Sequence, residues 1–383
     1  MKIGVIGAGK IGVSFALLCE KNGYDVIISD KDNDIVFNLN QKLYLTNEPI
    51  VQKLLFESKN IKATVDNVEV IKECDIIFTF VPTPPMMDNT YNTENVFKVT
   101  NEFFNASSLD IPIYEKNFVI CSTTNPGDVD QIQKKLAMFN IRVAYNPNLV
   151  IEGEIIKSFE NADILLIGTE YEEISKNIVS IYHKFQKTPI NSYVMSIKAC
   201  EVSKISIMTF LSLKINYANM IGEFMINLGL ENEIDLVLNS IGGDSRIGKK
   251  YMKYGFGFGG KYLPKALRAI GSYFKTLGMN VLSSPEDFNT QHSLFLKNFF
   301  IKKNPDKSVP FVMNHITNKK GNGMLEESQQ FQLCIDLLNS GYILNVIETP
   351  EISKSLNSLS ESYGGRLKFY KEGTNPEGFK IKL

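Results

Sequence analysis

The chain has 383 residues, with 41 Lys and Arg against 42 Asp and Glu, which gives a formal net charge of −1. At roughly 100–200 residues per domain, this length predicts about two or three domains. Hydrophobic residues make up 44% and charged residues 22% of the chain, a composition typical of globular proteins that argues against extended disorder. The balanced charge predicts no basic surface, so neither nucleic acid nor an anionic membrane is an expected partner.

The lack of a predicted membrane helix or signal peptide, together with the cysteine usage, favours a cytoplasmic location. No uninterrupted apolar run reaches the ~18 residues of a membrane helix. Residues 1–7 lead into a glycine pattern where a signal peptide would need a continuous apolar stretch. The five cysteines are odd in number, widely spaced and without a Cys-x-x-Cys pair, and the three histidines are scattered. We therefore expect a cytoplasmic protein with neither a disulfide framework nor a metal site.

The first part of the chain alternates short apolar runs with amphipathic segments, which predicts repeated βαβ units on a parallel sheet. Strands are expected at residues 2–6, 25–29, 75–80, 117–121, 142–145 and 163–167, and helices at 11–21, 93–104 and 131–139. Several of the strands are apolar on both faces, as expected where helices cover both sides of a sheet.

Residues 196–228 contain no proline and one glycine, Gly222, and their apolar residues recur at helical spacing. A helix of this length is about 50 Å long at 1.5 Å per residue, which is more than one domain needs. We expect it to connect two domains and to form a subunit contact. Two ordinary helices broken near Asn219 are the alternative.

The rest of the chain predicts a second, smaller α/β unit. A glycine-rich loop at 254–260 is followed by helices to about residue 303, then by a strand at 309–313, a helix at 326–339 and a strand at 343–347. The expected fold is therefore α/β, with an N-terminal Rossmann domain, a long central helix and a smaller Rossmann-like C-terminal domain. The expected boundaries are 1–195, 196–295 and 296–383.

A dinucleotide-binding pattern lies directly after the first predicted strand. Gly7, Gly9 and Gly12 form a G-x-G-x-x-G sequence that permits a tight turn, close approach of backbone to a pyrophosphate, and close packing of helix on strand. The second strand ends at Asp30, about twenty residues on, where a carboxylate can accept from the ribose hydroxyls of NAD and repel a 2′-phosphate. Two neighbouring lysines weaken that preference. A glycine-rich turn with no nucleotide is the alternative.

Polar segments follow three further strands, at residues 81–84, 122–127 and 146–153, and are expected at the same carboxyl edge of the sheet. On the long helix, Glu201 and Lys204 lie one turn apart, and a lysine in a closed apolar cleft has a lowered pKa and can move a proton. An exposed ion pair is the alternative. The glycines and aromatics of 254–260 favour a phosphate-binding loop, with a structural hinge as the alternative.

In order, these motifs resemble those of the UDP-glucose/GDP-mannose dehydrogenase family. The matching segments read GAGKIG, VPTP, STTNPG, NPNLVIEG, CEVSK, DSRIG and GFGFGGKYLPK. The resemblance implies NAD-dependent oxidation of a nucleotide-linked sugar at C6 to a carboxylate, in two hydride transfers with a cysteine thioester in the second. It also implies an NAD-binding, a central dimerisation and a nucleotide-sugar-binding domain, and a homodimer.

Residue roles also follow from the resemblance. Lys204 would be the acid/base residue and Thr123 would hold a water beside it. The implied cofactor-binding residues are Gly7, Gly9, Lys10, Ile11, Gly12, Asp30, Thr83, Thr123 and Glu152. The implied substrate-binding residues are Asn148, Leu149, Lys204, Met208, Asn219, Arg246, Tyr251, Phe256, Gly257 and Gly260, with Arg246 supplied by the partner subunit.

The chain departs from the family pattern around the second oxidation step. Tyr262 stands where the family has its nucleophilic cysteine, and Ala266 where it has an aspartate. The family's glutamate, helix asparagine and C-terminal arginine are replaced at Asn148, Met208 and Glu326. A phenol of ordinary pKa ~10 cannot replace a thiol of ~8.5 as a nucleophile at neutral pH.

The leading hypothesis is therefore an NAD-dependent dehydrogenase of a nucleotide sugar, with UDP favoured, that performs one two-electron step. Either Lys204 or Tyr262 takes the alcohol proton, and Tyr262 would need a neighbouring ammonium such as Lys261 to lower its pKa. Two alternatives stay open: a four-electron UDP-glucose-type 6-dehydrogenase that forms a uronate, and a catalytically silent nucleotide-sugar-binding homologue or partner subunit.

Overall fold

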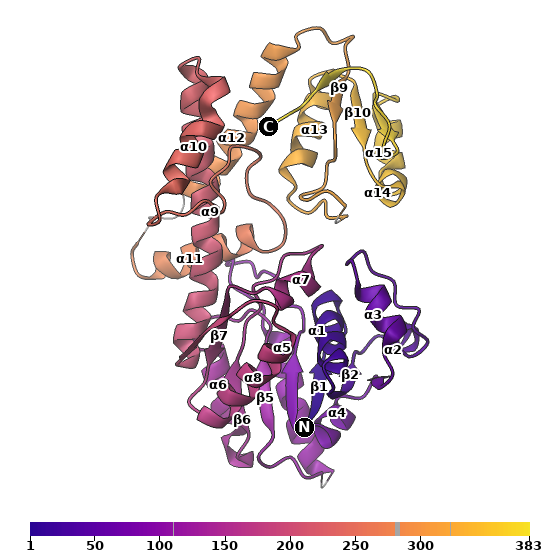
Figure 1. Cartoon of the computed structure of the whole chain (residues 1–383), viewed down its shortest axis with the longest axis vertical. Helices are drawn as coiled ribbons and strands as arrows, with labels where there is room; N and C mark the ends of the chain where they lie inside the picture. The colour runs from indigo at the N-terminus through magenta and orange to yellow at the C-terminus, as the bar shows by residue number, and fades with distance from the viewer. Residues whose placement is uncertain (110, 280–283, 322) are drawn as a thin grey trace. The chain divides into compact units, whose positions relative to one another are not determined.

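The computed structural model describes residues 1–109, 111–279, 284–321 and 323–383. The chain forms two compact units, Met1–Lys204 and Ile205–Leu383, and each is described here by itself (Figure 1). The expected division into three domains, at residues 195 and 295, stays a proposal.

The first unit is built on an eight-stranded sheet in the order β3-β2-β1-β4-β5-β6-β7-β8. The strands are β1 (Lys2–Ile6), β2 (Asp25–Ser29), β3 (Ile61–Thr64), β4 (Ile76–Thr79), β5 (Asn117–Ile120), β6 (Arg142–Tyr145), β7 (Ile164–Gly168) and β8 (Asn191–Met195). The strands from β3 to β6 are parallel, and β4 and β5 are buried along their whole length. The strand order reverses between β1 and β4, the position at which ligands bind in folds of this kind.

Helices cover this sheet in two groups (Figure 1). Helices α1 (Lys10–Lys21), α7 (Ile155–Glu160) and α8 (Glu172–Phe185) pack against one another, and the Phe15 ring of α1 lies among the rings of Phe78, Phe159 and Tyr182. Helices α4 (Asn67–Glu73), α5 (Glu94–Ser108) and α6 (Asp128–Leu136) form the second group. Helices α2 (Asn33–Asn40) and α3 (Val51–Glu57) lie between β2 and β3 in the chain, and a 3₁₀ turn, η1 (Ala137–Phe139), follows α6.

The parallel sheet predicted for the first part of the chain is confirmed from β3 to β6. Further along, β7 is antiparallel to β6 through the pair Tyr145 and Gly168. The connection between β6 and β7, residues 146–163, contains the six-residue helix α7. The connection from β7 to β8 contains the longer helix α8, and β8 is parallel to β7.

Helix α9 (Ile197–Asn227) is one continuous helix of 31 residues, so the alternative of two helices broken near Asn219 does not hold. It begins in the first unit and continues into the second. Its glycine has a packing role, because a Cβ at Gly222 would lie 2.0 Å from the Tyr254 ring. Glycine inside a helix costs about 1 kcal/mol relative to alanine. Here it makes room for the ring of Tyr254, the first residue of the glycine-rich loop 254–260.

The second unit combines helices with a four-stranded parallel sheet in the order β11-β10-β9-β12. After the 3₁₀ turn η2 (Glu231–Glu233), its elements are α10 (Ile234–Gly243), α11 (Leu263–Thr276), α12 (Ser284–Lys303), β9 (Phe311–Met313), α13 (Gln329–Asn339), β10 (Leu344–Ile347), α14 (Pro350–Ser355), α15 (Asn357–Ser362), β11 (Leu367–Tyr370) and β12 (Phe379–Lys380). Helix α13 begins three residues later than predicted because the Ser328 side chain accepts from the Phe331 N–H and caps it.

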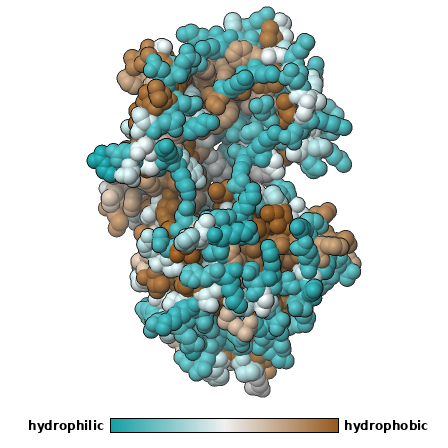
Figure 2. All heavy atoms as spheres, in the orientation of Figure 1, coloured by the Kyte–Doolittle hydropathy of each residue, from teal (hydrophilic) through white to brown (hydrophobic). Residues whose placement is uncertain are grey.

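Within the described residues, no helix combines the length and the apolar character needed to span a membrane. All five cysteines are buried and free. On the face drawn in Figure 2, hydrophobic side chains form patches among hydrophilic ones.

Candidate dinucleotide and active site

The glycine turn after β1 has the shape that its sequence predicts. Gly7 has φ +102°, and a Cβ there would lie 2.5 Å from the Phe80 carbonyl oxygen, while a Cβ at Gly12 would lie 2.0 Å from the Gly7 carbonyl oxygen. At Gly9, in contrast, a Cβ would meet nothing within 4 Å. Gly9 is also the N-cap of α1 and has no side chain to cap it. Backbone N–H groups and an open approach at a helix N-terminus fit the pyrophosphate of NAD.

Asp30 follows β2 and holds the glycine turn in place. Its Oδ2 accepts from the Ala8 N–H at 2.7 Å and its Oδ1 accepts from the Asp32 N–H at 3.1 Å. The buried Tyr44 lies near it: burial raises the pKa of Tyr44, and the charges of Asp30 and Glu48 add to the increase. Asp30 therefore lies where a carboxylate can meet an adenosine ribose. Tyr44 carries no motif and is not among the predicted residues.

The loop after β6 is held by two acidic residues. Lys10 of α1 forms an ion pair with Glu152 at 2.9 Å. Glu48, which is 3% exposed, accepts from the N–H groups of Gly153 at 2.6 Å and Ile155 at 3.1 Å, and so caps α7. Two predicted cofactor residues, Lys10 and Glu152, are thus in direct contact. The capping role of Glu48, which lies in an irregular loop, could not be predicted from the sequence.

The loops after β4 and β5 are joined by Ser122. Its hydroxyl donates to the Val81 carbonyl at 2.8 Å and accepts from the Val81 N–H at 2.9 Å. Thr83 is buried and Thr123 is half-buried. Two of the three predicted carboxyl-edge segments therefore lie side by side.

Lys204 is 6% exposed, and its Nζ donates to the backbone carbonyl of Asn148 at 2.5 Å. Burial lowers the pKa of Lys204 to about 8. The Asn148 side chain accepts from the Tyr182 hydroxyl at 3.3 Å. A buried amine of lowered pKa beside the loop 146–153 is a group that can exchange a proton near neutral pH.

Glu201 is fully buried, so the alternative of an exposed Glu201–Lys204 ion pair does not hold. Its carboxylate accepts from the Thr124 hydroxyl at 2.8 Å and from the N–H groups of Gly127 at 2.6 Å and Val129 at 3.1 Å. Burial raises the pKa of Glu201 to about 7, against the lowering effect of these hydrogen bonds. Glu201 thus caps α6 and ties the loop after β5 to the turn of α9 that carries Lys204.

In the second unit, the polar residues of α9 and α12 hold the glycine-rich loop. Asn219 is fully buried, and its Oδ1 accepts from the Gly255 N–H at 3.1 Å. The Asn289 side chain accepts from the Phe258 N–H at 2.9 Å and donates to the Phe258 carbonyl at 3.0 Å. A Cβ at Gly257 would lie 2.1 Å from the Asn289 oxygen. Among the predicted substrate-binding residues, Asn219 therefore supports the glycine-rich loop through a hydrogen bond from α9.

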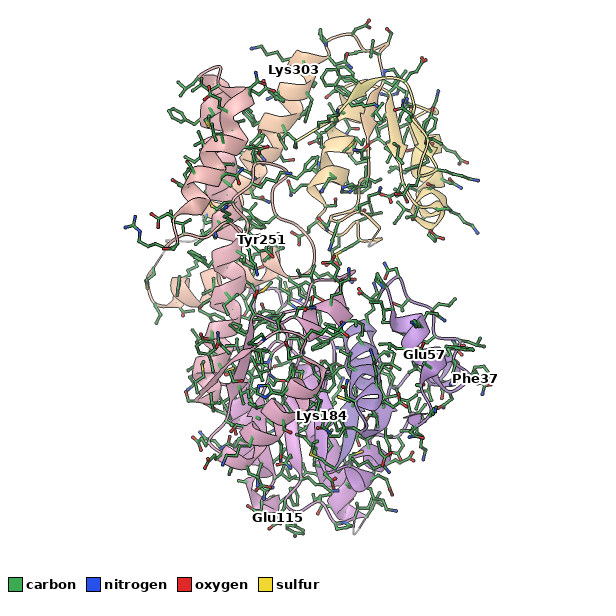
Figure 3. All side chains as sticks on the ribbon, in the orientation of Figure 1. Phe37, Glu57, Glu115, Lys184, Tyr251 and Lys303 are labelled. Carbon is green, nitrogen blue, oxygen red and sulfur yellow. The ribbon has the colours of Figure 1, made fainter. Side chains whose placement is uncertain are left out.

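The remaining predicted residues differ in exposure. Arg246 is on the surface and pairs with Asp244 two residues earlier, at 2.6 Å. Tyr251, labelled in Figure 3, is 41% exposed and has φ +66°.

The residues at the start of α11 differ in exposure: Tyr262 is 38% exposed, and Ala266 is buried. Leu149, Met208 and Phe256 are half-buried, and Gly260 is buried with φ +77°.

The thiols are not placed to act as nucleophiles. All five are buried. Burial raises the pKa of Cys74, Cys200 and Cys334 to about 12, and also raises the pKa of Cys19 and Cys121. A thiol in this state has almost no thiolate at neutral pH. Among these, Cys200 is the nearest to Lys204 in sequence.

Comparison with known proteins agrees with this geometry. Residues 1–186 match the NAD binding domain, and residues 198–291 the central domain, of the UDP-glucose/GDP-mannose dehydrogenase family. The chain is 29% identical over 308 residues to YtcA of Bacillus subtilis, an alignment that covers 78% of the chain and 69% of that relative. It is 24% identical over 282 residues to the UDP-glucose 6-dehydrogenase of Pseudomonas aeruginosa, covering 70% of the chain and 60% of the relative.

Among solved structures, that of a UDP-glucose dehydrogenase from Pyrobaculum islandicum superposes with a TM-score of 0.84 at 22% identity, covering 97% of this chain and 86% of the other. A likeness at this identity supports the fold, and the family match supports NAD as the cofactor.

Proposed function

The chain belongs to the UDP-glucose/GDP-mannose dehydrogenase family, and from this premise we propose that it oxidises a nucleotide-linked sugar with NAD in a single two-electron step. The product would be an aldehyde or a ketone. The observation that carries the proposal is the state of the possible nucleophiles. By the resemblance of the motifs, Tyr262 takes the position of the family's nucleophilic cysteine, and all five thiols of the chain are buried.

The proposed chemistry uses Lys204 as the base. NAD, when bound, would supply the hydride acceptor for the carbinol carbon. Lys204 in its neutral form accepts the hydroxyl proton, so that the C–H and O–H bonds break while the C=O bond forms. Its buried amine, held by the Asn148 carbonyl, has a pKa of about 8, which suits this transfer. Glu201 supports the reaction indirectly, by fixing the α9 turn that carries the lysine.

The second oxidation of the family is unsupported by these residues. It needs a thiolate that adds to the aldehyde and a group that directs water to the thioester. Tyr262 and Ala266 occupy the two positions that the family resemblance assigns to these tasks. A phenol and a methyl group supply neither, so the proposed reaction stops at the carbonyl compound.

The substrate class follows from the glycine-rich loop 254–260. Backbone N–H groups of glycines can surround a phosphate, and Phe256 can lie against a base or sugar. We favour a UDP-sugar because relatives named as UDP-glucose 6-dehydrogenases, one of them putative, are 29% and 24% identical to the chain. The residues assigned to the sugar, Asn148 and Met208 among them, differ from the family pattern and favour an unusual hexose or heptose.

A screen of nucleotide sugars with NAD tests the proposal. Absorbance at the NADH band and mass spectrometry of the product identify an accepted sugar, and Lys204→Met is the inactive control. We expect at least one UDP-sugar to yield NADH and a product two hydrogens lighter. If the protein binds UDP-sugars in calorimetry and no mixture gives NADH, it is a silent binding homologue and the proposal fails.

We also propose that the protein acts as a homodimer through α9. Phe210, Tyr217 and Met220 are 61%, 48% and 49% exposed on this helix. They line a groove of about 870 Å³ together with Ile247 and Phe288. A second copy of the chain is the expected occupant, since the resemblance assigns dimerisation to this segment. Light scattering after gel filtration should give twice the chain mass, and Tyr217→Asp should give the monomer.

We place this activity in the cytoplasm. The support is that all five cysteines are free and buried, as expected for a chain kept in a reducing compartment. Fractionation of cells that express the protein tests this assignment.

A further inference from the structure

The loop that precedes Tyr262 is anchored through its backbone from two helices. Both backbone polar groups of Gly255 form hydrogen bonds: its N–H donates to Asn219 Oδ1 at 3.1 Å, and its carbonyl accepts from His292 Nε2 at 2.7 Å. Phe258 is anchored in the same way, by both atoms of the Asn289 amide. The segment 255–258 is therefore fixed at both ends.

His292 is the least expected of these anchors. It lies on α12, is fully buried, and has acceptors at both ring nitrogens. Nε2 faces the Gly255 carbonyl, which can only accept, so Nε2 carries a proton. Nδ1 lies 2.5 Å from Glu223 Oε1, within hydrogen-bond distance. Glu223 thereby fixes the orientation of the imidazole that donates to the loop.

The surroundings of the ring leave it little freedom. The Tyr254 ring meets it edge-on at 5.9 Å between centroids, and the Phe288 ring, one turn earlier on α12, stacks on it at 6.2 Å. Tyr254 in turn occupies the space left by Gly222 on α9. Glu223, the partner of His292, is the next residue on that helix. The neighbouring α9 residues Gly222 and Glu223 thus both help to position the His292 ring.

The anchors leave other loop groups for a ligand. Within the described part of the chain, the N–H groups of Gly257 and Gly259 donate to no protein acceptor. Fixing Gly255 and Phe258 presets the direction of these N–H groups before a ligand arrives.

We propose that His292, held by Glu223, is a positioning residue for the nucleotide sugar. It fixes the carbonyl of Gly255 and so presets the N–H groups of the loop 255–260 that bind the diphosphate. This inference rests on the proposed function, because it assigns the loop to the substrate. His292 touches no reacting atom and takes no part in the proton transfer assigned to Lys204.

Steady-state kinetics of two variants test the proposal. His292→Phe keeps a planar ring and removes both donors, whereas His292→Gln keeps an N–H that can reach the Gly255 carbonyl. We expect His292→Phe to raise KM for the nucleotide sugar about tenfold, the loss of one buried hydrogen bond, with kcat and KM for NAD close to wild type. His292→Gln should recover most of the loss. The matched control is Ser293→Ala, the next residue on α12, which is buried and whose hydroxyl has no partner in the described structure.

A second measurement is independent of turnover. The chain has three histidines, so ring ¹H–¹⁵N spectra assign His292 by the signal that His292→Gln removes. We expect a proton on Nε2, and amide hydrogen exchange of Gly255 and Phe258 that becomes faster in His292→Phe and in Glu223→Ala but not in Ser293→Ala. Glu223 is partly exposed, so Glu223→Ala tests the pair even if His292→Phe does not fold.

The outcomes separate the two proposals. If the wild-type protein accepts no nucleotide sugar, the proposed function fails, and loop exchange still decides whether His292 orders the loop. Wild-type KM and wild-type loop exchange in His292→Phe would overturn the inference, as would an equal loss of kcat for every substrate.

Discussion

Lys204 Nζ donates to the backbone carbonyl of Asn148 at 2.5 Å, deep in the first unit. This bond connects the helix α9 to the loop after β6, at the carboxyl edge of the sheet. It holds the amine in place in either protonation state, because a neutral amine still donates. A base that keeps its position as it changes charge is well suited to a hydroxyl proton.

The pH dependence of oxidation should follow Lys204. Burial lowers its pKa to about 8, and the neutral amine is the active form. We therefore expect kcat to rise about tenfold per pH unit below 8 and to level off above it. Lys204→Arg, which stays protonated, should be inactive across the range. A kcat that is constant from pH 6 to pH 9 would exclude Lys204 as the base.

The same burial should appear in stability. The unfolded lysine keeps its proton up to about pH 10.5, whereas the folded one loses it above about 8. Between these values the unfolded chain binds more protons, so the free energy of unfolding rises with pH, by up to about 3 kcal/mol. Denaturant unfolding should show that the free energy of unfolding increases more from pH 8 to pH 10 in the wild type than in Lys204→Met. If the difference in unfolding free energy between the two proteins is the same at both pH values, the amine is not buried.

The glycine turn offers a matched pair of variants. A Cβ at Gly9 has open space and an ordinary backbone conformation, with φ −71°. We expect Gly9→Ala to keep its stability or gain up to about 1 kcal/mol, and to lose NAD affinity by at least about tenfold because the methyl group takes the place of the pyrophosphate. Calorimetry with NAD and denaturant unfolding measure the two effects.

Gly12→Ala is the counterpart. Its Cβ would lie 2.0 Å from the Gly7 carbonyl oxygen, so we expect a loss of about 1–3 kcal/mol of unfolding free energy. If both variants lost stability equally and bound NAD equally, the turn would not be a cofactor site.

Restoring the family's residues should change the product. In Tyr262→Cys with Ala266→Asp, a thiol and a carboxylate return to the start of α11, where position 262 is 38% exposed. We expect acid to appear beside the carbonyl product, detected by mass spectrometry. Tyr262→Phe with Ala266→Asp is the control and should form none. Acid formation by the control would place the second oxidation elsewhere.

The sequence predicts best the strands that are largely buried and the long helix that no proline interrupts. The bounds of β1, β2 and β6 agree with the predicted ranges, and α9 differs from its range by one residue at each end. Strand β8 is not anticipated, because it is an exposed edge strand in which apolar and polar residues give no clear alternation. Periodicity predicts where β7 lies in the chain but not its antiparallel direction beside β6.

The candidate site was predictable where a close backbone approach demands glycine, as at Gly7 and Gly12. Asp30 was predictable from its place at the end of the second strand. Glu48 and Glu201 are buried carboxylates that cap helices across long sequence separations, and nothing local distinguishes them from surface acids. His292 meets Glu223 69 residues away and Gly255 37 residues away, so its role appears only once the chain is folded.

The ratio of NADH formed to nucleotide sugar consumed tests the central proposal most directly. With purified protein, excess NAD and a limiting amount of an accepted sugar, we expect one NADH per sugar and a product with a carbonyl group that hydrazine traps. Two NADH per sugar, with a uronate as the product, would contradict it.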